Sequence, residues 1–225
     1  MKKQPKDNYS LCIDSQILDK NYNKLDQDQI IYYQSIMDNM VVCVNSCAGT
    51  GKTFIAILSA LELFKQGKFN HIYYIRIPDD RSLRLGFLPG DEIEKQSIYF
   101  RPFYDACNKL GIMSESIDDA IEDQSIILST DISLRGANIE KSFVIIDESQ
   151  NGSLQDLKLI LTRIADNCKV VMIGHSNQVD NFKKSNDHAF EKYIDHLCQK
   201  PWAKECKLVK NYRGQLSSWA DKLEI

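Results

Sequence analysis

The segment from Ser46 to Thr53 constrains the fold of this chain most strongly, because it joins two elements of different periodicity. It follows a short valine-rich run, residues 41–46, which is typical of a buried strand. It leads into residues 52–66, where apolar side chains recur at helical spacing. Gly49 and Gly51 let the connecting loop curl so that successive backbone N–H groups point inward. A strand, a glycine-rich turn and a helix in this order predict a phosphate-binding loop.

Individual residues of this phosphate loop have predicted roles. Lys52 would reach the β- and γ-phosphates of a nucleotide with its ammonium group, and the Thr53 hydroxyl would ligate Mg²⁺. Ser46 stands where the pattern G-x-x-x-x-G-K-[ST] has its first glycine, and we expect this small residue still to fit. The predicted nucleotide-binding residues of the loop are Ser46, Cys47, Ala48, Gly49, Thr50, Gly51, Lys52 and Thr53.

A second segment, residues 143–150, has four apolar residues followed by Asp147 and Glu148. It predicts a buried central strand that presents two carboxylates at its end. In enzymes with a phosphate loop, the aspartate holds magnesium, and the glutamate orients and deprotonates the attacking water. We therefore expect Asp147 to be a metal ligand and Glu148 to be the catalytic base.

Other polar and cationic side chains follow the predicted strands and helices. Gln178 comes soon after a strand at 169–174, and its amide is suited to bridge a water molecule and a γ-phosphate oxygen. Arg213 is the best candidate for the positive charge that stabilises the transition state. Three more arginines near element ends could contact phosphate, cross a subunit boundary or form surface ion pairs: Arg76, Arg135 and Arg163.

Strands and helices alternate along the chain, which predicts βαβ units in a doubly wound, mostly parallel sheet. The fold class is α/β: a RecA-like P-loop NTPase with three α/β/α layers, whose ligand binds beyond the carboxyl ends of the strands. Residues 1–40 are expected to form a lead-in of a helix and a strand packed on a single domain, 41–225. The predicted strands are 41–46, 71–77, 125–130, 143–147, 169–174 and 207–210. The predicted helices are 52–66, one ending near 110, 153–165, 187–199 and one from about 215.

Composition excludes several classes of protein. No apolar run approaches the roughly 20 residues of a membrane helix, and no apolar stretch follows the N-terminal lysines, so we expect a cytoplasmic protein without a membrane partner. A formal net charge of -3 argues against coating nucleic acid by charge alone, although a local basic groove stays possible. The seven cysteines include no C-x-x-C pair, which predicts reduced thiols rather than a zinc site.

From about residue 25 to 220 the chain resembles the PhoH-like ATPases, a branch similar to the ATPase core of superfamily-one helicases. The resemblance extends beyond the phosphate loop, and its most specific part is LGFLPGD at 85–91. It implies ATP and Mg²⁺ as cofactors, Gln29 as the reader of the adenine edge, and Arg213 at the γ-phosphate. It also implies RNA or single-stranded nucleic acid as a partner and a homo-oligomeric ring, such as a hexamer. The other matching segments are 134–136, 147–151, 161–163 and 208–213.

The chain departs from the family pattern at several positions. Ser46 and Cys47 replace Gly-Pro, Ser149 replaces Ala, and His175 stands where the family usually has Asp. The last departure bears on hydrolysis and its coupling, although a histidine at a strand end is more often structural. The short form without a fused domain is what phage-borne members look like.

Two functions are therefore compared. The first is an ATPase that acts on nucleic acid as a helicase-like remodeller, which would need an oligomer because the chain has one core. Residues 79–104, with Arg81, Arg84, Lys95, Phe100 and Tyr104, could supply its nucleic-acid surface. The second is a nucleotide-dependent switch or binding module with weak hydrolysis. A nucleotide kinase is a distant third, because those enzymes usually have a lid rich in arginine.

Overall fold

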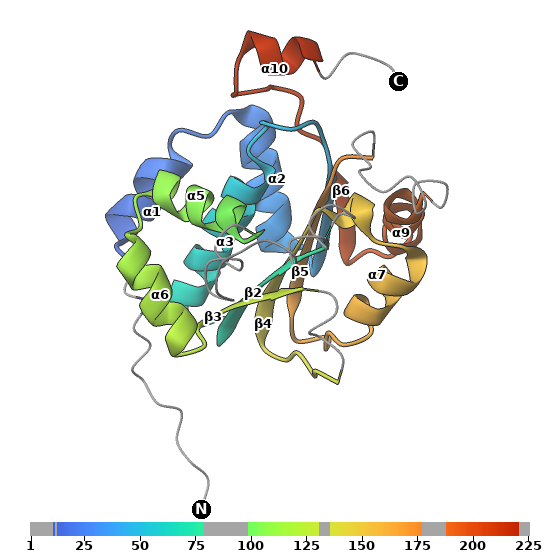
Figure 1. The fold of residues 1–225 in the computed structure, drawn as a ribbon, viewed down its shortest axis with the longest axis horizontal. Coiled ribbons are helices and arrows are strands. Elements are labelled where there is room, and N and C mark those ends of the chain that lie inside the picture. The colour runs from blue at the N-terminus through green and yellow to red at the C-terminus, as the bar shows by residue number, and fades with distance from the viewer. Residues whose placement is uncertain (1–10, 12, 79–98, 131–135, 177–187, 221–225) are drawn as a thin grey trace, which may run out of the picture.

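In the computed structural model, one parallel sheet is covered by helices on both faces (Figure 1). The structure describes residues 11, 13–78, 99–130, 136–176 and 188–220. Within these ranges six strands pair in the order β3-β2-β4-β5-β1-β6, and every pairing is parallel. The strands are β1 Val41–Asn45, β2 His71–Arg76, β3 Ile126–Thr130, β4 Ser142–Asp147, β5 Lys169–Gly174 and β6 Ala203–Cys206.

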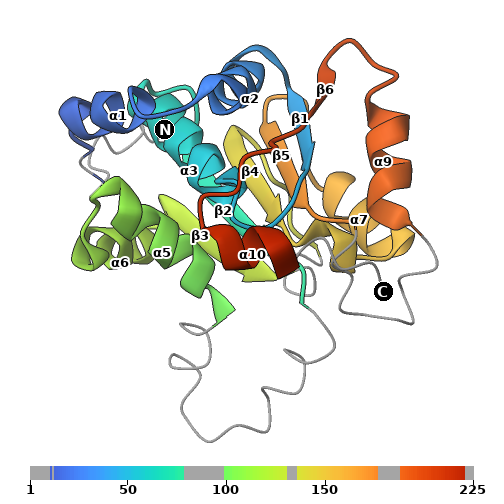
Figure 2. The same cartoon turned by 90° about the horizontal axis from the view of Figure 1, so that it is seen from above.

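Each face of the sheet has its own hydrophobic cluster beneath a helical layer, which confirms the predicted three-layer, doubly wound architecture. One layer comprises α1 Ser15–Tyr22, α2 Gln27–Asp38, α3 Lys52–Lys65, α5 Arg101–Leu110 and α6 Ser114–Glu122. The other comprises α7 Leu154–Leu161 and α9 Ala189–Leu197. The short α10, Gln215–Ala220, stands above the sheet, outside both layers (Figures 1 and 2).

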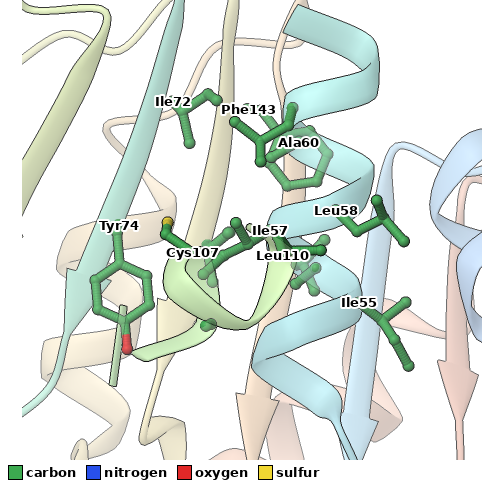
Figure 3. Packing of buried hydrophobic residues seen from close by; sticks show 14 of the residues in the cluster. Ile55, Ile57, Leu58, Ala60, Ile72, Tyr74, Cys107, Leu110 and Phe143 are labelled. Carbon is green, nitrogen blue, oxygen red and sulfur yellow. The ribbon is translucent and has the colours of Figure 1, made fainter. Parts of the chain in front are cut away.

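Helix α3 is buried along most of its length against the sheet. Strands β4 and β5 are buried along their whole length, because helices cover both of their faces. Figure 3 shows Ile57 and Ala60 of α3 packed among residues of the sheet and of α5, including Phe143 and Leu110. Each buried Ile, Leu or Phe side chain in this region contributes roughly 1.5–3 kcal/mol by burial. This packing fixes α3, and with it the helical end of the phosphate loop.

The segment before β1 folds as two helices, so the predicted lead-in strand is wrong over the described residues 11 and 13–40. Asp26 begins α2, because its carboxylate accepts the Gln29 backbone N–H at 2.9 Å and the Gln29 amide oxygen accepts the Asp26 N–H at 3.2 Å. The Lys169 ammonium donates to the Ile36 carbonyl at 2.5 Å, and so ties the end of α2 to β5. These contacts hold Gln29 beside the phosphate loop.

Three further elements differ from the prediction. The last strand is β6 and not 207–210, because the Leu208 N–H bonds to the Ser46 hydroxyl at 2.7 Å instead of to a strand. Helix α6 has no counterpart among the predicted elements, and the helix predicted over 153–165 is the shorter α7. In the part of the chain that the structure describes, no helix is long and apolar enough to span a bilayer.

Candidate nucleotide-binding site

A cavity of about 580 Å³ lies where the carboxyl ends of β1, β4 and β5 meet, within the size range of ligand pockets. Strand β1 leads into the phosphate loop, and β4 ends at the two carboxylates. Strand β5 lies between them, so β1 and β4 are separated by two interstrand distances, about 10 Å. The predicted site residues that line the cavity are Gln29, Ala48, Gly49, Thr50, Gly51, Lys52, Thr53, Arg76, Asp147, Glu148 and Arg213.

The two glycines of the phosphate loop are required by both conformation and space. Gly49 has φ +79° and Gly51 has φ +90°, in the left-handed region that side chains rarely adopt. A Cβ atom at position 49 would lie 2.8 Å from Cγ of Arg213, and one at position 51 would lie 2.9 Å from Nε2 of Gln29. The side chain of Arg213 therefore lies against the loop at Gly49, and the side chain of Gln29 lies against it at Gly51.

The positive charge of the loop comes from Lys52, whose Nζ donates to the carbonyl of Cys47 at 2.7 Å and also to that of Ser46. Burial lowers the pKa of this ammonium, while the carboxylates of Asp147 and Glu148 oppose the shift. Helix α3 begins at Lys52, so its positive N-terminal end adds to the same charge. Together they give the loop the positive charge and the N–H groups that could hold a phosphate group.

Asp147 is buried and held in a fixed orientation. The Tyr74 hydroxyl donates a hydrogen bond to Oδ2 of Asp147, and the Glu148 backbone N–H donates to Oδ1 at 3.0 Å. Burial raises the pKa of Asp147 to about 6, and the neighbouring Glu148 charge adds to this shift. A buried carboxylate that shares a cavity with the Thr53 hydroxyl offers the oxygen ligands that Mg²⁺ prefers, so these residues fit that ion.

Glu148 has an unusual backbone conformation, and two neighbours, Arg76 and Gln150, hold its side chain. Its φ of 56° is left-handed, which is uncommon for a residue with a side chain and is typical of functional sites. Arg76 Nη2 lies 3.6 Å from Oε1 of Glu148, and Gln150 Nε2 donates to Oε2 at 2.7 Å. Gln150 in turn accepts the His175 backbone N–H at 3.1 Å, which connects Glu148 to the end of β5. The Arg76 guanidinium also donates to the Tyr99 carbonyl at 2.7 Å.

Some predicted residues lie elsewhere. Gln178 and Arg135 lie outside the described residues. Ser46 and Cys47 supply carbonyl oxygens to Lys52. Phe100 was predicted to contribute to a nucleic-acid surface, but it is only 5% exposed and belongs to the core of the α3 layer, so it cannot do so.

Three residues of the site were missed by sequence reasoning. Tyr74 is buried on β2 and looks like an ordinary core residue, so no pattern pointed to its bond with Asp147. Gln150 belongs to a recognised motif without an assigned role. Asn211 donates from its amide to the Ala48 carbonyl at 3.0 Å, a contact that only the folded chain brings together.

Comparison with known proteins places the chain in a family. The family model described as PhoH-like protein matches residues 22–219. A PhoH-like protein of Synechocystis sp. is 34% identical over 156 residues, which cover 68% of this chain and 47% of that protein. A PhoH-like protein of Bacillus subtilis is 32% identical over 150 residues, covering 66% and 46%. The chain thus spans about half the length of these curated relatives.

Among solved structures, the DUF1998 helicase MrfA bound to DNA aligns with a TM-score of 0.50 at 14% identity, over 88% of this chain and 28% of that one. This likeness concerns the fold alone. The family rests on the matched model and the curated relatives: the chain belongs to the PhoH-like protein family.

Proposed function

We propose that this chain binds ATP with Mg²⁺ in the cavity, hydrolyses it, and uses the cycle to remodel RNA or single-stranded DNA in a helicase-like manner. The observation that supports this proposal is that one cavity is lined by Lys52, Asp147, Glu148 and Arg213. A phosphate-binding cation, a metal-binding carboxylate, a base and a second cation are the parts that phosphoryl transfer to water needs. The activity is assigned to the cytoplasm, where ATP is available.

Nucleotide binding would begin at the phosphate loop. Lys52 and the loop N–H groups would hold the β- and γ-phosphates, with the adenine toward Gln29. The Gln29 amide also donates to the Thr50 carbonyl at 3.2 Å, so it would position the loop as well as the base. Arg76 and Arg135 remain proposed nucleotide contacts, and Gln178 a proposed sensor of the γ-phosphate.

Thr53 and Asp147 would hold the magnesium ion. When bound, Mg²⁺ neutralises charge on the phosphate oxygens. The Tyr74 hydroxyl and the Glu148 N–H would keep the Asp147 carboxylate oriented for this role. Because these bonds come from β2 and from the residue directly after β4, the Asp147 carboxylate would already be oriented when the ion enters.

Hydrolysis would depend on Glu148 and Arg213. The Glu148 carboxylate would orient the attacking water and accept its proton, while Arg213 would stabilise the charge that develops on the γ-phosphate. Arg213 would act within the chain or across a subunit boundary. We also propose that the protein acts as a homo-oligomeric ring, such as a hexamer.

One observation favours a second function, a nucleotide-dependent switch with weak hydrolysis. Glu148 is already engaged by the Arg76 guanidinium and the Gln150 amide. A carboxylate whose two oxygens are already held by a guanidinium and an amide is not free to orient the attacking water. Turnover would then stay slow until the pair separates.

Steady-state ATP turnover with and without single-stranded RNA and DNA distinguishes the two functions. Stimulation by one nucleic acid, at saturating Mg²⁺, is the result expected for the remodeller and identifies its substrate. Tight ATP binding with slow turnover that neither nucleic acid changes would contradict the remodeller and support the switch. A chain that binds no ATP would overturn both.

A further inference from the structure

The C-terminal arm, defined as residues 207–220, crosses over the phosphate loop and is attached to it. The Leu208 N–H donates to the Ser46 hydroxyl at 2.7 Å, and the Tyr212 N–H donates to the Gly49 carbonyl at 2.8 Å. The Asn211 amide adds a third bond, to the Ala48 carbonyl at 3.0 Å. Leu208 is buried beneath these contacts. The inner side of the arm therefore has a defined partner, the phosphate loop.

The outer side of the arm is apolar and exposed. Val209 is 80% exposed, Leu216 84% and Trp219 75%. Side chains of this kind concentrated on a short surface segment are typical of an interaction site. Helix α10, which carries Leu216 and Trp219, stands clear of both helical layers, so neither layer covers it (Figures 1 and 2).

The charge of the arm indicates which partner suits it. Residues 207–220 include Lys207, Lys210 and Arg213 but no acidic residue, in a chain whose formal net charge is -3. Lys210 Nζ lies 4.8 Å from the ring centre of Tyr212. Lys207 lies 3.7 Å from Glu205, an exposed pair that contributes little and is easily exchanged for another anion. Cations interleaved with exposed aromatic rings are the pattern that binds single strands, with phosphates on the cations and bases on the rings.

We propose that the outer side of the C-terminal arm binds single-stranded nucleic acid, with Lys207 and Lys210 on its phosphates and Trp219 stacked on a base. This inference rests on the proposed function, and it identifies the surface that would bind the RNA or single-stranded DNA. The arm would then lie between the nucleic acid and the phosphate loop, bound to the strand on its outer side and hydrogen-bonded to the loop on its inner side. A change of the loop on nucleotide binding would therefore act directly on the strand-binding arm through Ser46 and Leu208.

Tryptophan fluorescence tests the proposal, because the chain has only two tryptophans, Trp202 and Trp219. In the Trp202→Phe protein, the emission comes from Trp219 alone. Titration with single-stranded oligo-dT and oligo-U should quench this emission. Binding should weaken as salt rises, since phosphate contacts release counterions.

Three variants separate the contributions, with affinity measured by fluorescence anisotropy of labelled oligonucleotides. Trp219→Ala should weaken binding by about 5- to 150-fold, the range for loss of one stacked base. Lys207→Ala with Lys210→Ala should reduce the salt slope by about 1.4, at about 0.7 per phosphate contact. Lys158→Ala with Lys192→Ala removes the same charge from exposed positions on α7 and α9 and should leave binding unchanged. Circular dichroism checks that each variant is folded.

Three other outcomes would contradict nucleic-acid binding by the arm, and each points to a different explanation. If the wild type binds and the arm variants bind equally well, the nucleic acid lies elsewhere and the proposed function survives. If the arm variants change only the sedimentation coefficient, the arm is a contact between copies of this chain. If the wild type binds neither oligonucleotide, the nucleic-acid part of the proposed function fails together with the arm surface.

Discussion

The hydroxyl oxygen of Ser46 accepts a hydrogen bond from the backbone N–H of Leu208 at 2.7 Å. Position 46 is the first of the phosphate loop, where the usual pattern has a glycine and therefore no hydroxyl. In this chain the substituted residue joins the loop to the C-terminal arm, and both partners are buried. From the sequence alone, serine at position 46 is only a small residue that fits in place of glycine. In the structure it connects the phosphate loop to the C-terminal arm.

Ser46→Ala should loosen the arm. Removal of the hydroxyl leaves the buried Leu208 N–H without its acceptor, at a cost of about 1–3 kcal/mol. Hydrogen exchange of the Leu208 amide should accelerate accordingly. Ser59→Ala is the matched control, because its hydroxyl bonds to the Ile55 carbonyl within α3. Equal exchange at Leu208 in the wild type and both variants would show that the bond does not hold the arm.

Tyr74→Phe should weaken magnesium binding more than nucleotide binding. The variant keeps the ring and removes the hydroxyl that donates to Asp147. Bonds to charged groups contribute about 1.5–3 kcal/mol, so half-saturation by Mg²⁺ should rise by about 10-fold or more. Affinity for ATP in the absence of divalent cations should stay close to that of the wild type.

Tyr73→Phe is the control for this change, because its side chain packs against the cluster on the other face of the sheet. Magnesium dependence measured as ATP turnover should match the wild type in this variant. If Tyr74→Phe and Tyr73→Phe behave alike, Tyr74 has no part in positioning Asp147.

Cys198 should react with alkylating agents at neutral pH. A hydrogen bond from the Cys43 thiol lowers the pKa of the Cys198 thiol to about 7, against the opposing effect of partial burial. The thiolate is the reactive form, so the alkylation rate should rise with a midpoint near pH 7 rather than near about 8.5. Cys43→Ala removes the donor and should move this midpoint upward.

Site-resolved mass spectrometry after iodoacetamide treatment measures the rate at Cys198 separately from the half-buried Cys47. A midpoint at Cys198 near the ordinary thiol value, unchanged by Cys43→Ala, would rule out the bond between the two thiols.

Local sequence patterns predicted most of the sheet, because buried strands and the helices between them have short-range signals. Strands β1, β4 and β5 lie within one residue of their predicted bounds. What escaped prediction depends on contacts between distant segments. The Tyr74–Asp147 and Ser46–Leu208 bonds join residues 73 and 162 positions apart, and no local spacing encodes them. The last strand was misplaced for the same reason, since the bond at Leu208 takes the chain away from the sheet.

The central claim is that Glu148 catalyses ATP hydrolysis in this cavity. The most direct measurement is steady-state ATP turnover of the wild type, Glu148→Gln and Glu122→Gln, the last an exposed glutamate at the end of α6. We predict that Glu148→Gln loses about 100-fold or more of the rate, because it lacks the base, while it still binds ATP. Glu122→Gln should match the wild type. Equal turnover in Glu148→Gln and the wild type would contradict the claim.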